Sequence, residues 1–349
     1  MRSTKWLKIR VCLAAVAATL ALHGPRVVQA EPSAARSVPS TISAGAQGVL
    51  RGLLDGGGKL FTVPAQADGA VWKRLQDDME RRFVPISRDI ARQCGVDVRA
   101  TTLGGVPVLD VRPKGYKPDG RVLVFTHGGG FTLLSARATL GSAALMARAT
   151  GLRVVSVDYS LAPAARWATI QEQATAVVKA LVRSGCPMKR MAIYGDSAGG
   201  NLAVRTVLNL RDGHLGMPAA VVLFSPWVDL TNEGDTAATL AEADPTLSYP
   251  GFLLPSARAY ADGLDLRDPR VSPVYADFTR GFPPTLIQEG TRTVLLSTSV
   301  RLYQRLDAAG AGAVIDMYEG MWHDFQGTPI PESDRAIRKA AAFIRAHLR

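Results

Sequence analysis

The sequence predicts an α/β fold in which helices cover both faces of a mostly parallel sheet. Short apolar runs alternate with longer amphipathic stretches through most of the chain. Alternation of this kind is typical of strands that are joined by crossover helices. The length of 349 residues suits one large domain, because a single hydrophobic core stops growing near that size.

The expected elements follow from the positions of these runs. Apolar runs are predicted as strands at residues 106–111, 121–126, 153–158, 191–194, 219–224, 286–289 and 314–317. Helices are expected between them, at residues 140–149, 170–183, 201–211, 294–309 and 333–347. Residues 233–268 interrupt this order and contain an apolar run of their own, which indicates a cap insertion.

The first 30 residues have the pattern of a secretory signal. Four Lys or Arg residues precede an apolar core of 12 residues, and Ala30 ends a small-residue cleavage site. The core is too short for a stable membrane anchor. We therefore expect a signal peptide at residues 1–30, cleaved before Glu31, and a mature protein in the periplasm or outside the cell.

Two segments are expected between this signal and the α/β domain. Residues 31–60 are rich in Ser, Ala, Gly and Pro, which is typical of a flexible linker. Residues 61–100 carry apolar side chains at helical spacing and are expected to form N-terminal cap helices, interrupted at Pro85. The α/β domain is then expected to span residues 101–349.

Charge and cysteine content exclude some classes of function. Removal of residues 1–30, which include five basic residues and no acid, lowers the formal net charge from +11 to +6. No Lys and Arg block with interleaved aromatic residues is present, so nucleic-acid binding is not expected. Cys94 and Cys186 remain, and export would permit a disulfide between them. Neither cysteine nor any group of histidines has the spacing of metal ligands, so we expect no metal.

The segment from Gly195 to Gly199 reads G-x-S-x-G between a predicted strand and a predicted helix. This turn lifts a serine hydroxyl clear of a sheet, which makes Ser197 the candidate nucleophile. The helix that starts there directs its free N–H groups toward any anion that forms beside Ser197. The N–H of Ala198 is therefore a candidate donor to such an anion.

A second glycine-rich turn lies about 70 residues upstream. His127 and three glycines follow a predicted strand, and their N–H groups have no side chains in front of them. Together with Ala198, Gly128 and Gly129 are expected to form an oxyanion hole. We expect His127 to hold this glycine loop rather than to act as a base.

The general base has to be another histidine. His323 follows the last predicted strand and precedes the final helix. The order of Ser197 followed by His323 is the one expected when a nucleophile turn opens a helix in a parallel sheet. His323 is therefore the candidate base.

These motifs resemble the hormone-sensitive-lipase family, and more narrowly its bacterial esterase and monoterpene-lactone-hydrolase-like branch. The resemblance runs from about Arg99 to the C terminus. It rests on GDSAGG at 195–200, HGGGF at 127–131, DYSLAP at 158–163, SPWVDLT at 225–231, ADP at 243–245 and EGMWH at 319–323. It implies the α/β-hydrolase fold and a serine esterase that needs no cofactor.

One position departs from this family. The resemblance places the acid of the catalytic triad in the loop after the predicted strand 286–289, where this chain has Arg292 and Thr293. Loss of that acid lowers turnover by roughly 10⁴-fold in triads of this type. Glu289 on the strand and Asp229 after the preceding strand are possible surrogate acids, and the absence of any acid is the third possibility.

The sequence therefore leads to two hypotheses. The first is serine-dependent hydrolysis of short to medium acyl carboxylic esters or lactones, small molecules, through an acyl-enzyme intermediate. The alternative is a catalytically weak or inactive member of the fold that binds a small apolar ligand. The replaced acid motivates the alternative, and some relatives that the resemblance brings in, such as the plant gibberellin receptors, have lost a triad residue. The sequence does not predict the natural substrate or the oligomeric state.

Overall fold

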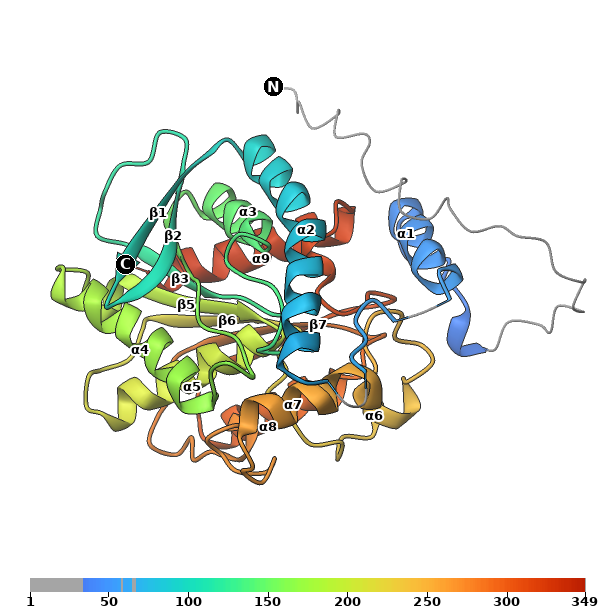
Figure 1. Ribbon diagram of the computed structural model, residues 1–349. Coiled ribbons are helices and arrows are strands. Elements are labelled where there is room, and N and C mark those ends of the chain that lie inside the picture. Colours follow the sequence, from blue (N-terminus) through green and yellow to red (C-terminus); the bar gives the residue numbers. More distant parts are fainter. Residues whose placement is uncertain (1–33, 58, 65–66, 349) are drawn as a thin grey trace, which may run out of the picture.

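The computed structural model describes residues 34–57, 59–64 and 67–348, and Figure 1 shows their arrangement. The signal peptide expected at residues 1–30 lies outside the described residues. The remainder forms one sheet between two layers of helices, so the predicted fold class is confirmed.

The sheet has eight strands in the order β1-β2-β4-β3-β5-β6-β7-β8. Their bounds are β1 Val96–Leu103, β2 Val106–Pro113, β3 Val122–Thr126, β4 Arg153–Val157, β5 Met191–Asp196, β6 Ala220–Phe224, β7 Thr285–Gly290 and β8 Ala313–Tyr318. β2 pairs antiparallel with β1 and β4, and the other neighbours are parallel. The carboxyl ends of β3, β5, β6, β7 and β8 therefore lie at one edge, where the predicted site residues follow them.

Two layers of helices bury the two faces of this sheet. α3 Leu140–Thr150 and α9 Pro331–His347 pack on one face, and α4 Trp167–Arg183, α5 Ala198–Asp212 and α8 Leu296–Ala308 cover the other (Figure 1). Alternate residues of β3 serve the two layers: Leu123 and Phe125 pack under α3, whereas Val122 and Val124 pack under α5. The central strands are buried on both faces, which explains their continuous apolar runs.

The first strand was not predicted. β1 is an edge strand whose residues are mostly exposed, so it lacks the apolar run that marks the other strands. It begins after Gly95, which ends the preceding helix in the left-handed conformation at φ 65°. The segment at residues 61–100 was expected to form cap helices. Its helix ends at Cys94, and its last residues, from Val96 onward, belong to β1 of the sheet.

The long helix before β1 corrects a second expectation. α2 Gly69–Cys94 continues through Pro85, where an interruption was expected. Proline removes the hydrogen bond to the carbonyl four residues earlier, which is that of Arg81. Arg81 and Pro85 are both exposed, so water can solvate that carbonyl and the helix does not end.

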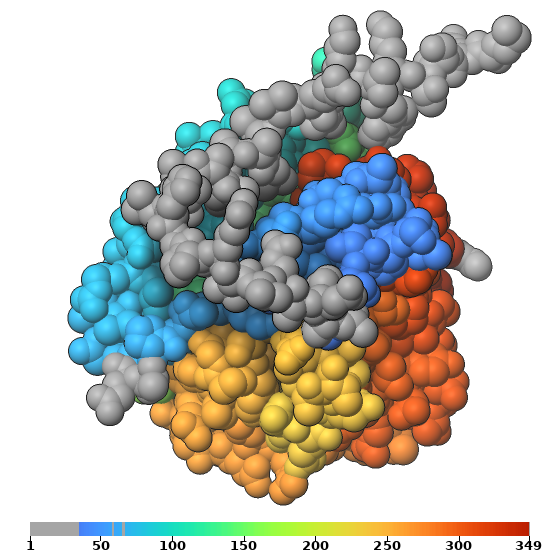
Figure 2. Space-filling view, turned by 90° about the vertical axis from the view of Figure 1, so that its right-hand side faces the viewer, coloured from blue at the N-terminus to red at the C-terminus, as the bar shows by residue number. Residues whose placement is uncertain are grey.

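The expectation of a flexible linker at residues 31–60 is wrong for most of its described part. α1 Ala44–Asp55 is a helix, and its side chains Ala46, Leu50 and Leu54 are buried against the loop after β8 and the start of α9. Figure 2 shows this blue helix against the red C-terminal part of the chain. Its apolar residues recur at every fourth position, a helical signal that the many small residues between them obscured.

A cap is built from two distant parts of the chain. The segment 59–64 is bound to the insertion, because the N–H of Leu60 donates to the carbonyl of Thr246 at 3.1 Å. The N–H of Val63 likewise donates to the carbonyl of Gly251 at 2.7 Å. The insertion holds α6 Thr236–Thr239, a π-helical turn at Tyr249–Leu253 and α7 Leu254–Ala261.

The two cysteines do not form a disulfide. Cys94 is buried with α3 on one face of the sheet, and Cys186 packs against the core of the opposite face. The sheet separates the two thiols, so the pairing that the sequence left open does not occur in this structure.

Leu50→Ala tests the packing of α1. The Leu50 side chain is completely buried, so its truncation should lower the free energy of unfolding by about 2–5 kcal/mol. Urea denaturation measures this change. Arg51→Ala is the matched control on the exposed side of the same helix and should change it by less than about 0.5 kcal/mol. Equal midpoints for wild type and Leu50→Ala would show that α1 does not pack as described.

Candidate active site

The turn at Ser197 joins β5 to α5 in a strained conformation. Ser197 has φ 53° and ψ −122°, outside the regions that a residue with a side chain favours. Glycines make the turn possible. A Cβ on Gly199 would lie 1.9 Å from the carbonyl oxygen of Thr126, and one on Gly195 would lie 2.3 Å from the carbonyl oxygen of Gly199. Only glycine at both positions lets the helix start this close to β3.

The hydroxyl of Ser197 is left free by its surroundings. The backbone of Ser197 is held on both sides: its N–H donates to the carbonyl of Phe224 at 2.9 Å, and its carbonyl accepts the N–H of Trp227 at 2.9 Å. Its side-chain oxygen has no hydrogen-bond partner among the described residues. Ser197 keeps 4 % of its surface exposed, so the hydroxyl lies at the floor of the site.

The glycine loop after β3 revises the predicted oxyanion hole. The N–H of Gly128 donates to Asp196 Oδ1 at 3.0 Å, so it is not free for a substrate oxygen. The N–H groups of Gly129, Gly130 and Ala198 donate to no residue in the part of the chain that the structure describes. Gly130 therefore replaces Gly128 beside Gly129 and Ala198 as a candidate donor.

His127 has a structural position, as the sequence led us to expect. Its ring stacks on Tyr159 with 4.1 Å between centroids, and Nδ1 lies 2.8 Å from the carbonyl of Gly128. The hydroxyl of Tyr159 donates to the carbonyl of His127 at 2.6 Å. Burial lowers the pKa of His127, so its imidazole is neutral. These contacts let the ring support the glycine loop.

The cap forms an apolar wall beside this loop. A Cβ on Gly130 would lie 2.8 Å from the ring of Phe252. Phe252 stacks on Phe61 from the N-terminal segment at 5.2 Å, and Phe131 stacks on Tyr260 of α7 at 3.7 Å. The space next to the oxyanion donors is therefore narrow and lined by aromatic rings.

His323 lies in the loop after β8, close to the Ser197 turn. The segment after β6 connects the two: Ser225 Oγ accepts the N–H of Asp324 at 3.2 Å, and Trp227 binds the backbone of Ser197. No hydrogen bond joins Ser197 to His323 in the described part of the chain. Instead His323 Nε2 lies 3.0 Å from Asp324 Oδ2, and Nδ1 is buried without a partner.

The charges around His323 favour its protonated form. Burial alone would lower the pKa of the imidazole, but the carboxylates of Asp324, Asp244 and Glu289 raise it to about 9. Asp324 has the largest effect of the three. The next acid, Asp196, lies directly before Ser197, and desolvation followed by the charge of Asp324 raises its pKa well above the usual range.

Glu289, one of the two surrogate acids expected from the sequence, lies within electrostatic reach of His323. It is fully buried at the end of β7, accepts a hydrogen bond from Ser299 Oγ at 2.6 Å and another from the N–H of Gly290 at 3.0 Å. Burial raises its pKa to about 7, although these hydrogen bonds and the charge of His323 oppose the rise.

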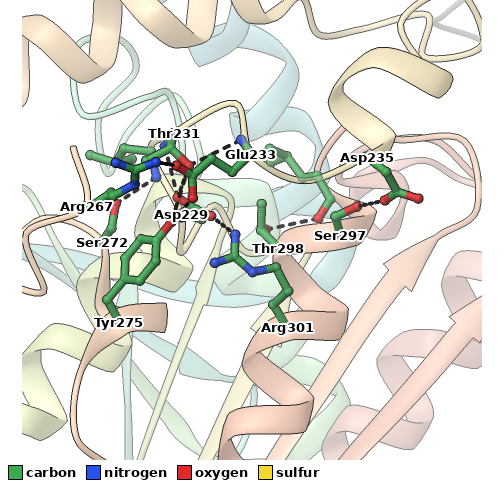
Figure 3. A network of polar contacts seen from close by, with 12 residues as sticks. Asp229, Thr231, Glu233, Asp235, Arg267, Ser272, Tyr275, Ser297, Thr298 and Arg301 are labelled. Carbon is green, nitrogen blue, oxygen red and sulfur yellow. Dashed lines mark hydrogen bonds and ion pairs between the residues drawn. The ribbon is translucent and has the colours of Figure 1, made fainter.

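Asp229, the other candidate, belongs to a separate polar network (Figure 3). Its carboxylate pairs with Arg301 of α8. It also accepts hydrogen bonds from two groups of Thr231, the N–H at 3.0 Å and the Oγ1 hydroxyl at 2.7 Å, and from the hydroxyl of Tyr275 at 3.3 Å. Among the described residues it makes no contact with His323. The structure therefore does not bring Asp229 to the base.

Arg292, which stands where the resemblance expects the acid, points away from the imidazole. Its guanidinium donates to the carbonyl of Ala35 in the N-terminal segment, and its N–H donates to the carbonyl of Met321 at 3.0 Å. Burial lowers its pKa, and no acid in the described chain pairs with it.

Sequence reasoning missed two residues of this site, Gly130 and Asp324. Asp324 was visible as the acid directly after the candidate base, but a neighbour in the chain is not expected to reach the ring in an extended loop. The left-handed backbone of Asp324, with φ 54°, turns its carboxylate back onto the imidazole.

Metal ligands and membrane spans were also considered. The described residues contain no group of three His, Cys, Asp or Glu side chains that could hold a metal ion. None of their helices is both long and apolar enough to cross a membrane.

Comparison with known proteins places this geometry among hydrolases. A family model described as alpha/beta hydrolase fold matches residues 123–327. The chain is 36 % identical over 247 residues to an acetyl-hydrolase of Streptomyces hygroscopicus, covering 70 % of this chain and 81 % of that protein.

Solved structures show the same likeness. A crystal structure of an esterase superposes with a TM-score of 0.82 at 30 % identity, covering 95 % of this chain and 99 % of the other. An esterase from the bacterial hormone-sensitive lipase family superposes with a TM-score of 0.71 at 30 % identity, covering 81 % and 100 %. The predicted family resemblance is confirmed.

The burial of Glu289 predicts a pH-dependent stability. Its pKa rises from 4.5 to about 7 on folding, so the folded chain favours the protonated carboxyl. The contribution of Glu289 to stability should therefore be greatest below pH 4.5 and fall by about 3 kcal/mol as the pH rises through 7. In Glu289→Gln this loss should be absent. The urea midpoint of the variant should therefore exceed that of wild type by a margin that grows between pH 4.5 and pH 7.5. Glu319→Gln, at an exposed position, should follow wild type, and parallel curves for all three proteins would refute the assignment.

Proposed function

This chain belongs to the alpha/beta hydrolase fold family and is a carboxylic ester hydrolase, and we propose that it cleaves its substrate through an acyl-enzyme on Ser197. The single observation that carries this mechanism is the strained Ser197 turn, whose hydroxyl and three neighbouring N–H groups are bound to no residue that the structure describes. A strained residue that the surrounding packing enforces is typical of a functional site.

The first half of the reaction forms the acyl-enzyme. Nε2 of His323 takes the proton of Ser197 while Oγ attacks the ester carbonyl, and the carbonyl oxygen becomes an anion. The N–H groups of Gly129, Gly130 and Ala198 donate to that oxygen. The N terminus of α5 adds its positive dipole end at the same place. The imidazolium returns its proton to the alcohol, which leaves.

The second half repeats these steps with water. His323 removes a proton from a water molecule, and the resulting hydroxide attacks the acyl carbonyl. The same three N–H groups hold the second tetrahedral anion. When this anion collapses, its bond to Ser197 Oγ breaks, the carboxylic acid leaves, and the imidazolium returns its proton to Oγ. No cofactor takes part in either half.

Glu289 is the carboxylate that we assign to the imidazolium formed in both halves. It is buried near His323, and Ser299 and the N–H of Gly290 hold it in place. The carboxylate of Asp229 forms an ion pair with Arg301. Of the two candidate surrogate acids, we therefore assign Glu289 to His323. A carboxylate without a direct hydrogen bond to the ring stabilises the imidazolium less than a triad acid does, so we expect slow turnover.

The substrate is a small ester or lactone with a short acyl group. The aromatic wall formed by Phe252 over Gly130 narrows the space beside the oxyanion donors. The relative with 36 % identity is named an acetyl-hydrolase, which agrees with a small acyl group. A long acyl chain would require the cap to move.

Because the acid of the family's catalytic triad is replaced in this chain, binding of a small ligand without catalysis is the competing hypothesis. Arg292 stands at the family's acid position, and Nε2 of His323 is paired with Asp324 rather than Ser197. A protein of this kind would bind a small apolar molecule without turning it over.

Ser197→Ala distinguishes the two hypotheses. Wild type should release p-nitrophenol from p-nitrophenyl acetate in a burst that equals the enzyme concentration, followed by a slower steady rate. The variant should lose the burst and at least about 10³-fold of the steady rate, because no acyl-enzyme can form. A fluorophosphonate probe should label wild type only. Equal rates in both proteins would reject Ser197 as nucleophile, and ligand binding without a burst or labelling would favour the binder.

Glu289→Gln tests the surrogate acid. The amide keeps the size of the side chain but removes the charge that stabilises the imidazolium, so kcat should fall between roughly 10- and 10³-fold. Asp229→Asn is the matched control, and its kcat should stay within about twofold of wild type. The reverse pattern would assign the role to Asp229, and no effect of either change would show that the base works without these acids.

A further inference from the structure

We propose that Asp324 restrains the catalytic base: its carboxylate holds Nε2 of His323, and this contact has to open before the imidazole can take the proton of Ser197. The inference rests on the ester hydrolysis proposed above. It assigns Asp324 as a positioning residue that sets the pH range in which the enzyme works.

The geometry of the loop places the carboxylate on the ring. Asp324 Oδ2 lies 3.0 Å from His323 Nε2. The backbone of Asp324 is left-handed, with φ 54° and ψ 34°, and its N–H is held by Ser225 Oγ at 3.2 Å. These two features turn the side chain back toward the preceding residue. The contact is therefore built into the loop.

The contact excludes base catalysis while it lasts. A general base has to present a lone pair to the hydroxyl that it deprotonates. Nε2 in contact with a carboxylate carries a hydrogen and donates it to Asp324, so it offers no lone pair to Ser197. Nδ1 has no partner, which leaves Asp324 as the one carboxylate in hydrogen-bond contact with the ring among the described residues.

The side chain of Asp324 lies nearer to solvent than the imidazole does, and its Oδ1 is bound to no described residue. The side chain of Asp324 is 30 % exposed, and that of His323 is 5 % exposed. Rotation of Asp324 into solvent would free Nε2 without disturbing the packing of the imidazole. Deprotonation of His323 would remove the attraction that holds the two together.

The other charged groups that face His323 are fixed by their own partners. Asp244, from the insertion, accepts the N–H groups of Thr246 and Leu247 and, through Oδ2, that of Val294 at 2.9 Å. Glu289, from β7, is held by Ser299 at 2.6 Å. Their charges therefore remain when Asp324 is changed.

The remaining two groups lie on other elements. Asp196, at the end of β5, is partly buried and accepts the N–H of Gly128. Arg292, in the loop after β7, faces the carbonyl of Ala35. Replacement of Asp324 thus removes the one partner that Nε2 has among the described residues. It also removes a charge that raises the pKa of Asp196, whereas Asp244, Glu289 and Arg292 keep their own partners.

The restraint predicts an alkaline working range. With a pKa of about 9, roughly 1 % of His323 is neutral at pH 7. The neutral fraction, and with it kcat/KM, should rise about tenfold for each pH unit and level off above pH 9. Loss of the negative partner should move this rise to lower pH.

Asp324→Asn tests the restraint. Asparagine accepts the left-handed backbone and keeps the N–H that Ser225 binds, so the loop should fold as in wild type. We would measure kcat/KM for p-nitrophenyl acetate from pH 6 to 10, corrected for spontaneous hydrolysis. The midpoint of the rise should lie near pH 9 in wild type and at least about one unit lower in the variant. At pH 7 the variant should therefore be about five- to tenfold faster.

Glu319→Gln is the matched control. Glu319 is an exposed acid of the same loop with no bond to the imidazole among the described residues, so its variant should keep the wild-type midpoint. An Asp324→Asn variant that is slower at every pH with an unmoved midpoint would overturn the proposal, because Asp324 would then be an acid that the reaction needs. An unchanged profile would overturn it as well.

Titration of the His323 ring by NMR separates this inference from the proposed function. The Cε1–H signal should titrate near pH 9 in Ser197→Ala and at least one unit lower when Asp324→Asn is added. This readout does not require turnover, so it stands even if wild type hydrolyses no ester. A ring that titrates below pH 7 in the presence of Asp324 would reject the restraint whether or not the protein is an esterase.

Discussion

The site depends on the close approach of the start of α5 to the end of β3. At Gly199 a side chain would collide with the backbone of Thr126, so glycine at this position is what lets the helix begin beneath the oxyanion loop. The same approach forces the strained backbone of Ser197 and allows Asp196 to bind the N–H of Gly128. One packing constraint thus positions the candidate nucleophile Ser197 together with the candidate N–H donors, and the packing of the buried sheet around the turn stabilises its strained conformation.

The base is held by a different part of the molecule. The loop that carries His323 packs on α1 through Met321, Trp322 and Phe325, and Ser43 before α1 binds both carboxylate oxygens of Glu332 at 2.8 Å. The N-terminal segment also provides the carbonyl that binds Arg292. A cation that would disfavour the imidazolium is thereby directed away from it, while Glu289 and Asp324 bring negative charge to the ring from other positions. The imidazole is therefore influenced by the charge of Glu289, which makes no direct contact with it among the described residues, and by Asp324, which contacts Nε2.

The sequence predicted those features that short segments decide. The central strands, the Ser197 turn and the position of His323 between the last strand and last helix follow from local patterns of apolar residues and glycine. The failures share a cause. β1 is exposed and has no apolar run, α1 hides its apolar face among small residues, and Pro85 lies where water can replace the lost hydrogen bond. In each case solvent or a distant partner decided the structure, and neither is visible in the segment itself.

The amino-acid sequence by itself predicted the fold class and indicated Ser197 as candidate nucleophile and His323 as candidate base, because these follow from periodicity, glycine placement and chain order. Only the tertiary structure decided which groups surround them. Gly128 is occupied because Asp196 approaches it, Asp229 is remote because Arg301 binds it, and Asp324 reaches His323 because its backbone turns back. Hydrogen-bond partners and charge–charge contacts depend on distances of a few ångströms between side chains, and such distances exist only once the strands have met at a common edge of the sheet.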